Sequence, residues 1–279
     1  MLKSGSAGAF AETTLPWGLD IRYHPDETIG ASIWRAGVFD ISVSETIWRL
    51  LDEGEHVLDV GANIGYMTSI MAKRVGRHGS ISAFEPHPEI FAELQTNIEK
   101  WQDHKDVCDI LAYQIALSDK DGVARLNLGE CFDSNRGTAS LNDSGHDSAG
   151  RSVDVEAKTL SGFFGSGEKF GLMKIDVEGH EMSVFRGGEE LFRRHQIRDI
   201  VFEEHDTPPT PVTEFLQDCG YTIFFVTKGF LGLQVYDLAS LPERNPFESP
   251  NYVATTDPER TMSRLKKKGW SLIGYLNFS

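Results

Sequence analysis

The chain has 279 residues, of which 40% are hydrophobic and 25% charged, and its net charge is -15. These fractions are ordinary for a globular protein and exclude collagen-like, mucin-like and wholly disordered chains. Proteins that bind nucleic acid need a basic surface to displace counterions from phosphates, yet the only dense basic run is Lys266, Lys267 and Lys268. We interpret this run as a solvated helix face and expect no nucleic acid among the partners.

The cysteines and the apolar segments indicate where in the cell the protein is expected. Cys108, Cys131 and Cys219 are odd in number and form no CxxC pair, so we expect reduced thiols. The N-terminus lacks the apolar core of a signal peptide, and no stretch approaches the ~20 apolar residues that span a bilayer. We therefore expect a cytoplasmic protein with no membrane partner. Nothing in the sequence indicates an oligomeric state.

The pattern along the chain predicts three parts. Residues 1–51 are expected to form a polar tail and a helical cover. Residues 52–257 are expected to form the core, because short apolar runs alternate there with segments of helical spacing, as in a parallel α/β sheet with right-handed crossovers. Residues 221–238 and 251–256 are expected to form a hairpin at the sheet edge, with the last strand antiparallel. Residues 258–279 are expected to form a terminal helix and tail.

A long loop is predicted at residues 130–151, which are rich in Gly, Ser, Asn and Asp and show no periodicity. Loops of this length in compact domains are often lids or binding segments. Asn135, Arg136 and Ser140 are therefore candidates for contacting a substrate when the loop closes. A solvated loop without such contacts is the alternative interpretation.

A glycine turn follows the first core strand, which ends at Asp59. Gly61 and Gly65 let the backbone bend tightly and approach a ligand, and the following helix begins with free N–H groups. The spacing is GxxxG, whereas a dinucleotide fold uses GxGxxG to seat a pyrophosphate. A ligand without phosphates fits better, and Asp59 would attract the cationic groups of S-adenosylmethionine.

Two further strand ends point to the same ligand. Glu85 ends the second strand, where doubly wound folds place an acid that accepts hydrogen bonds from both ribose hydroxyls. Ser118 and Asp119 end the third strand and are candidates for contacting the adenine, with a polar turn as the alternative. Glycine turns and strand-end acids are common in α/β proteins, so only their combination in register is informative.

Four polar groups end the next two strands: Asp176 and Glu178 on one, Glu203 and His205 on the other. Open α/β sheets bind ligands at the carboxyl ends of their strands, so neighbouring strands would bring these groups together beside the sulfonium. His205 or Asp176 would then take a proton from the acceptor. The alternatives are acids favoured at a helix N-terminus and a surface histidine. Nothing fixes six-coordinate geometry for Mg²⁺, so we expect no metal.

These segments together resemble the FkbM family of class I methyltransferases. The resemblance rests on LDVGANIGY at 58–66, FEP at 84–86, ALSD at 116–119, KIDVEGHE at 174–181 and IVFEEH at 200–205. It implies a Rossmann-like, mostly parallel sheet of seven strands with helices on both faces, and S-adenosylmethionine as the methyl donor. It further implies O-methylation of a hydroxyl on a small molecule such as a natural product or a sugar.

The resemblance also assigns residues. It implies cofactor contacts at Asp59, Gly61, Asn63, Gly65 and Glu85, and an acidic cluster facing the transfer site at Asp176, Glu178 and Glu203. The N-terminal cover departs from the family pattern, because VFD stands at 38–40 where many relatives show a tyrosine and a glutamate. This departure leaves the acceptor open.

Three alternative functions remain at this stage. The carboxylates suit an amine as well as a hydroxyl, so N-methylation of an amino sugar stays open. A nicotinamide-dependent oxidoreductase is the second, although the glycine spacing argues against it. The third is a module that binds S-adenosylmethionine without catalysis.

Overall fold

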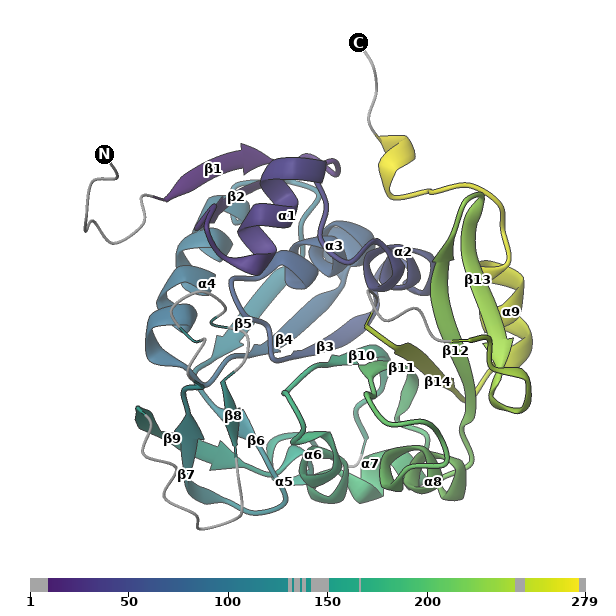
Figure 1. Ribbon diagram of the computed structural model, residues 1–279. Coiled ribbons are helices and arrows are strands. Elements are labelled where there is room, and N and C mark those ends of the chain that lie inside the picture. Colours follow the sequence, from purple (N-terminus) through teal and green to yellow (C-terminus); the bar gives the residue numbers. More distant parts are fainter. Residues whose placement is uncertain are drawn as a thin grey trace.

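The computed structural model describes residues 10–129, 132, 136, 139–141, 151–165, 167–243 and 249–275. Most of the loop predicted at 130–151, including Asn135, lies outside the described residues. Figure 1 shows a central sheet seen nearly along its layers, with helices above and below it.

The central sheet has eight strands in the order β13-β12-β14-β11-β10-β3-β4-β5. From β5 to β11 all neighbours are parallel, whereas β14 pairs antiparallel with both β11 and β12, and β13 pairs antiparallel with β12. The strands are β3 (His56–Val60), β4 (Ser80–Phe84), β5 (Asp109–Tyr113), β10 (Phe170–Ile175), β11 (Ile197–Glu203), β12 (Thr222–Gly229), β13 (Gly232–Asp237) and β14 (Asn251–Thr255).

The predicted α/β sheet, mostly parallel and with an antiparallel last strand, is confirmed, but two details differ. The sheet has eight strands, the additional one being β13 at its edge. The last strand, β14, lies between β11 and β12 instead of at the edge. All five residues of β14 are buried, and a strand buried on both faces needs neighbours on both sides to satisfy its backbone hydrogen bonds.

Helices cover both faces of the sheet (Figure 1). One face packs against α1 (Thr28–Ala36), α2 (Ile41–Leu50), α3 (Tyr66–Val75), α4 (Pro88–Trp101) and α9 (Pro258–Leu265). The opposite face packs against α5 (Leu160–Phe163), α6 (Glu181–Gly187), α7 (Glu189–Arg193) and α8 (Pro211–Asp218). Side chains alternate between these two cores along each strand, as in Val57 and Leu58 of β3. Short 3₁₀ turns are η1 (Gly76–His78), η3 (Leu238–Ser240) and η4 (Ile273–Tyr275).

A smaller sheet lies beside the main one, with strand order β6-β9-β7-β8. Its strands are β6 (Ala116–Leu117), β7 (Gly122–Asn127), β8 (Ser140–Leu141) and β9 (Ser152–Lys158). The third predicted strand, which was expected to end at Ser118 and Asp119, is therefore two strands, β5 and β6, which belong to different sheets. The N-terminal part also contributes a hairpin of β1 (Ala11–Thr14) and β2 (Asp20–Tyr23).

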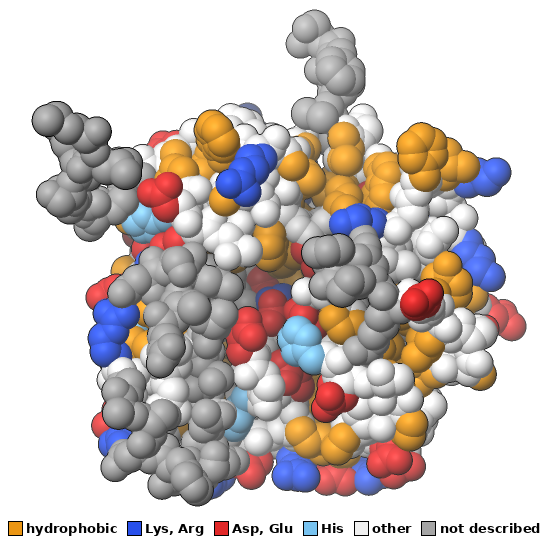
Figure 2. Space-filling view, viewed as in Figure 1, with side chains coloured by type: hydrophobic (Ala, Val, Ile, Leu, Met, Phe, Trp, Pro, Cys, Tyr) orange, Lys and Arg blue, Asp and Glu red, His pale blue; other side chains and the backbone are white. Residues whose placement is uncertain are grey.

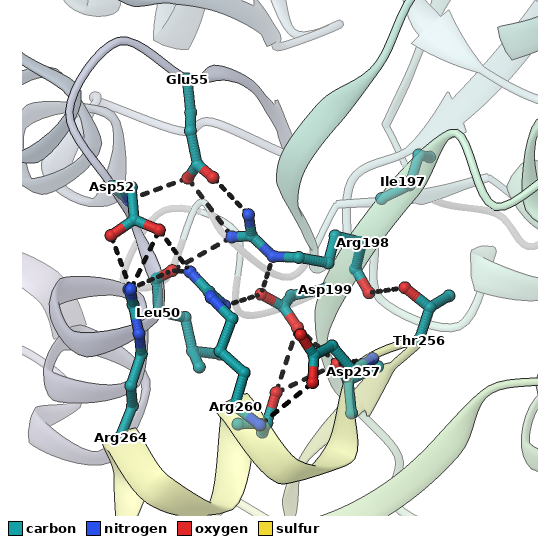
Figure 3. A network of polar contacts seen from close by, with 12 residues as sticks. Leu50, Asp52, Glu55, Ile197, Arg198, Asp199, Thr256, Asp257, Arg260 and Arg264 are labelled. Atoms are coloured by element: carbon teal, nitrogen blue, oxygen red, sulfur yellow. Dashed lines mark hydrogen bonds and ion pairs between the residues drawn. The ribbon is translucent and has the colours of Figure 1, made fainter.

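A polar network joins the C-terminal helix α9 to the edge of the core (Figure 3). Arg260 and Arg264 on α9 both bind the Asp52 carboxylate at the end of α2, at 2.8 and 2.7 Å. Arg260 also binds the fully buried Asp199 on β11 at 3.0 Å, and Arg198 binds Glu55 and the Asp199 carboxylate. Four ion pairs thus connect α9, β11 and the segment between α2 and β3, and a fifth joins Arg198 to Asp199 within β11.

A second contact between α2 and the C-terminal segment is buried. Arg49 pairs with Glu45 one turn earlier, with both side chains shielded from solvent. The Arg49 guanidinium also donates to four backbone carbonyls between residues 264 and 269. The Glu45 carboxylate accepts from the Ser271 and Leu272 N–H groups.

We predict that Arg49→Met destabilises the fold by roughly 3–5 kcal/mol, because it leaves the Glu45 carboxylate buried without its cation. The matched control is Arg193→Met on α7, which removes an exposed pair of the same i,i+4 spacing with Glu189 and should cost less than about 1 kcal/mol. Urea unfolding of both variants measures the difference. Equal losses of stability would contradict the assignment of the buried pair.

Candidate active site

A cavity of about 430 Å³ lies at the carboxyl ends of the central parallel strands β3, β4, β10 and β11. Figure 2 shows it as a hollow near the middle of the face, with acidic and histidine side chains gathered in it. This is the place where open α/β sheets bind their ligands. Helix α2, α3 and the smaller sheet supply the remaining walls, with Val43, Tyr66, Met67, Leu117 and Leu126 among them.

The glycine turn between β3 and α3 forms one wall. Gly61 has φ +76°, and a Cβ there would lie 2.0 Å from the Asp176 carbonyl oxygen, so only glycine fits. Asn63 also has positive φ, and both residues line the cavity. Gly65 does not belong to the lining. A Cβ on Gly65 would lie 2.7 Å from the Leu94 side chain, so this glycine lets α3 pack closely against α4.

Glu85 lies at the end of β4 and lines the cavity. Its carboxylate accepts from the Asn63 N–H at 3.0 Å and from the His87 N–H at 2.9 Å, which fixes it against the glycine turn. Burial raises the pKa of Glu85 to about 7. Each carboxylate oxygen retains a lone pair for a hydroxyl donor, so the group can still hold a ribose.

Asp59 lies behind the turn rather than in the cavity wall. It is fully buried and accepts from the Thr68 hydroxyl at 2.6 Å. Its nearest cation is the Lys174 ammonium, 3.8 Å away. Burial raises the pKa of Asp59, and Lys174 opposes that rise. Asp59 therefore does not line the cavity and is linked to the glycine turn through Lys174, which corrects the expectation of a direct cofactor contact.

The predicted acidic cluster comes together at the other side of the cavity. Asp176, Glu178, Glu203 and His205 all belong to the lining. The His205 imidazole lies 3.3 Å from the Glu203 carboxylate. Burial and the nearby Asp176 carboxylate raise the pKa of Glu178 to about 7 and also raise the pKa of Glu203. Glu178 takes a left-handed conformation, with φ +52°, a strain that often marks functional positions.

Sequence reasoning gave Lys174 no role. This lysine is buried on β10, and its ammonium donates to the Gly61 carbonyl at 2.7 Å. The same ammonium lies 3.6 Å from the Asp176 carboxylate. It therefore fixes the glycine turn and compensates the charge of two acids. The signal was an unexplained lysine inside the apolar strand FGLMKI, since lysine is almost never fully buried without a partner.

Asp40 and Asn251 were also missed as part of the site. Asp40 caps α2 by accepting from the Val43 N–H, and its other oxygen accepts from the Asn251 side chain at 3.1 Å. Both residues line the cavity. Burial raises the pKa of Asp40. Asp40 belongs to the VFD segment that departs from the family pattern, and β14 is too distant in sequence for spacing to have linked the two.

Of the remaining predicted site residues that the structure describes, only Arg136 lines the cavity. Ser118 and Asp119 do not line the cavity, and the Ser118 hydroxyl contacts the His180 imidazole at 3.0 Å. Arg136 does line it, and its guanidinium is held by Glu27 and Glu93. Ser140 pairs through its backbone in β8. Within the described ranges, no group of three His, Cys, Asp or Glu residues is arranged to hold a metal ion.

The fold and the cavity define an α/β protein with a cavity at the carboxyl ends of parallel strands, beside a glycine turn. The sequence profile described as "Methyltransferase FkbM domain" matches residues 59–223. The chain belongs to this family. The resemblance seen in the sequence motifs is thereby confirmed.

The chain is also similar to individual proteins, and it spans less than two thirds of the length of two of them, 57% of one and 49% of the other. Methyltransferase 1 of Beauveria bassiana is 32% identical over 152 residues, which cover 47% of this chain and 57% of that protein. Hexuronic acid methyltransferase AglP of Haloferax volcanii is 27% identical over 67% of this chain and 72% of that protein. A crystal structure of methyltransferase FkbM from Methylobacillus flagellatus KT superposes with a TM-score of 0.47 and 15% identity, covering 83% of this chain and 49% of that one.

Family membership makes S-adenosylmethionine the cofactor, as the motifs predicted, and the residues of the cavity fit it. The turn at Gly61 and the carboxylate of Glu85 both line the cavity, and a carboxylate can accept from ribose hydroxyls. The acids Asp176, Glu178 and Glu203 supply negative charge for a sulfonium.

We predict that the affinity for S-adenosylmethionine rises with pH up to about pH 7 and levels off above it. Burial raises the pKa of Glu85 to about 7, and only the ionised form accepts from both ribose hydroxyls, so acidification through that value removes binding. Calorimetric titration between about pH 5.5 and 8.5 measures this. Glu85→Gln should flatten the dependence. A wild-type affinity that stays constant over this range would contradict the role of Glu85.

Proposed function

We propose that the enzyme transfers the methyl group to a hydroxyl of a small molecule held between the glycine turn and the acidic cluster. The observation that carries this proposal is the convergence of Asp176, Glu203 and His205 on one side of a cavity whose other side is built by Gly61 and Glu85. S-adenosylmethionine supplies an activated methyl on a sulfonium. The residues of the chain supply alignment and a proton acceptor.

His205 takes the hydroxyl proton in this proposal. Histidine is the side chain most often used as a general base, and the Glu203 carboxylate at 3.3 Å orients the imidazole. Asp176 lies beside Lys174, which holds it at the floor of the cavity. Asp176 then orients the acceptor by accepting from a second hydroxyl. Asp40 and Asn251 bind the part of the acceptor that faces α2 and β14.

The charge of the cavity limits the acceptor class. Its described lining holds five acids: Asp40, Glu85, Asp176, Glu178 and Glu203. The two basic side chains in that lining, Lys174 and Arg136, are each paired with acids. A hexuronate, the kind of substrate named for the Haloferax volcanii relative, would meet repulsion here. A neutral sugar or natural-product hydroxyl suits the cavity better.

An amine acceptor is the second candidate, and the same acids favour it. An ammonium would bind well to this lining, although it must lose a proton before it can accept the methyl group. Incubation with methyl-labelled cofactor and three matched sugars tests which acceptor the enzyme prefers. The three are a neutral sugar, its amino sugar and its uronic acid. We expect transfer to the neutral sugar or the amino sugar. Preferred transfer to the uronic acid would overturn the proposal, and the bond formed in the product distinguishes O- from N-methylation.

A further inference from the structure

The tip of the β12–β13 hairpin carries two exposed apolar residues. Gly229 pairs with Gly232, so the turn consists of Phe230 and Leu231 alone. Phe230 is 98% exposed and Leu231 65% exposed. Turns of two residues usually carry Asn, Asp or Gly. Within the described part of the chain, neither side chain packs into a hydrophobic core or lines the cavity.

The basic run of the C-terminal segment lies beside this tip. The Gly269 N–H donates to the Leu231 carbonyl at 2.8 Å, and a Cβ on Gly232 would lie 2.7 Å from the Gly269 carbonyl oxygen. The three lysines that directly precede Gly269 are exposed, as is Lys228 at the end of β12. We call Lys228, Phe230, Leu231 and Lys266–Lys268 the hairpin patch. Figure 2 shows apolar and basic side chains gathered over this end of the hairpin.

The charge of the patch contrasts with that of the chain. Neither the segment 226–236 nor the segment 262–272 contains an Asp or Glu, whereas the whole chain has 42 acidic and 27 basic residues. Charges farther away than about 8 Å are largely screened at physiological ionic strength. An anionic surface would therefore be attracted at this patch and repelled by most of the remaining molecule.

We propose that the hairpin patch docks the enzyme on an anionic lipid surface. A bare aromatic and aliphatic pair at a convex tip suits shallow insertion at the boundary of headgroups and acyl chains, and the surrounding lysines suit the headgroup phosphates. This mode of binding needs no spanning segment, and no helix within the described part of the chain is long and apolar enough to cross a bilayer. The proposal departs from the expectation of a solvated lysine run with no membrane partner.

Co-sedimentation of the full chain with vesicles tests the proposal. We expect binding to phosphatidylcholine vesicles that contain phosphatidylserine, weak binding to pure phosphatidylcholine, and loss of binding as salt is raised. Changing Lys266, Lys267 and Lys268 to Gln should lower the partition coefficient by roughly 100-fold. Phe230→Ser with Leu231→Ser should lower it by a similar factor.

The matched control changes three exposed lysines outside the patch, Lys105, Lys120 and Lys169, to Gln. It alters the net charge equally and should leave vesicle binding within about twofold. Three results would each overturn the proposal: no vesicle binding by the wild type, equal loss in the control, or no loss in the patch variants. Light scattering in the absence of lipid tests the alternative that the patch binds a second copy of the chain. A dimer that dissociates in the Phe230→Ser, Leu231→Ser variant and ignores vesicles would assign the patch to self-association.

Discussion

The change His205→Gln should lower the rate of methyl transfer by about 10²–10⁴-fold, the usual contribution of a positioned general base. Glutamine keeps a polar side chain of similar reach but cannot take the proton. The exposure of His205 at the cavity mouth, 75% for its side chain, makes a folding defect in the variant unexpected. Single-turnover transfer from labelled cofactor, with the neutral sugar or another accepted substrate, measures the rate.

Two controls define the role of His205. His104→Gln, at an exposed position outside the cavity, should leave the rate unchanged. Calorimetry should show that His205→Gln binds the cofactor as the wild type does, because His205 serves the acceptor. Full turnover by His205→Gln, combined with loss of turnover in Asp176→Asn, would identify Asp176 as the residue that takes the proton. Full turnover by both variants would refute the whole assignment of the base.

The change Gly61→Ala should abolish measurable cofactor binding and destabilise the fold by roughly 3 kcal/mol or more. A methyl group there would lie 2.0 Å from the Asp176 carbonyl oxygen, in a backbone conformation that already disfavours alanine. The turn would have to move away from β10, and the Asn63 N–H would then lose the Glu85 carboxylate. Thermal unfolding and calorimetry measure the two effects.

Gly37→Ala is the matched control for Gly61→Ala. Gly37 has nearly the same φ, +74°, but a Cβ there meets no atom within 4 Å. This control therefore carries the conformational cost alone, about 1 kcal/mol, and should leave cofactor binding intact. If the two variants lost equal stability, the close contact between Gly61 and Asp176 would have no energetic importance.

Three of the residues expected to contact the cofactor line the cavity, and the sequence indicated them because strand ends and glycine turns are local patterns. Gly61, Asn63 and Glu85 follow buried strands directly, and parallel strands bring their carboxyl ends to one edge. Gly65 was predicted as a cofactor contact in the same way, but it does not line the cavity. Its glycine is required by the packing of α3 against α4, which has the same sequence signature as a ligand contact.

The acceptor side was readable only in part. The ends of β10 and β11 gave Asp176, Glu178, Glu203 and His205, because these strands are neighbours in the sheet. Asp40 and Asn251 are 211 positions apart and meet through a side-chain hydrogen bond, which no periodicity indicates. Their contact depends on β14 lying between β11 and β12, whereas the sequence placed that strand at the edge.

Ser118 and Asp119 lie away from the cavity because the third predicted strand is divided between two sheets. The chain leaves the main sheet after Tyr113 and enters the smaller sheet as β6. The polar turn after β6 therefore does not coincide with the carboxyl edge of the main sheet. Ala116 and Leu117 line the cavity instead, and these apolar residues in a largely apolar segment gave no sign of a binding site in the sequence.

The central claim is that the cavity holds S-adenosylmethionine through the glycine turn and Glu85. Calorimetric titration of the cofactor into the wild type, Glu85→Gln and the exposed neighbour Glu89→Gln tests it most directly. We expect Glu89→Gln to bind as the wild type does, and Glu85→Gln to bind roughly 100-fold more weakly, through loss of two charge-assisted hydrogen bonds. Unchanged affinity in Glu85→Gln, or a wild type that binds a nicotinamide dinucleotide and ignores S-adenosylmethionine, would contradict the claim.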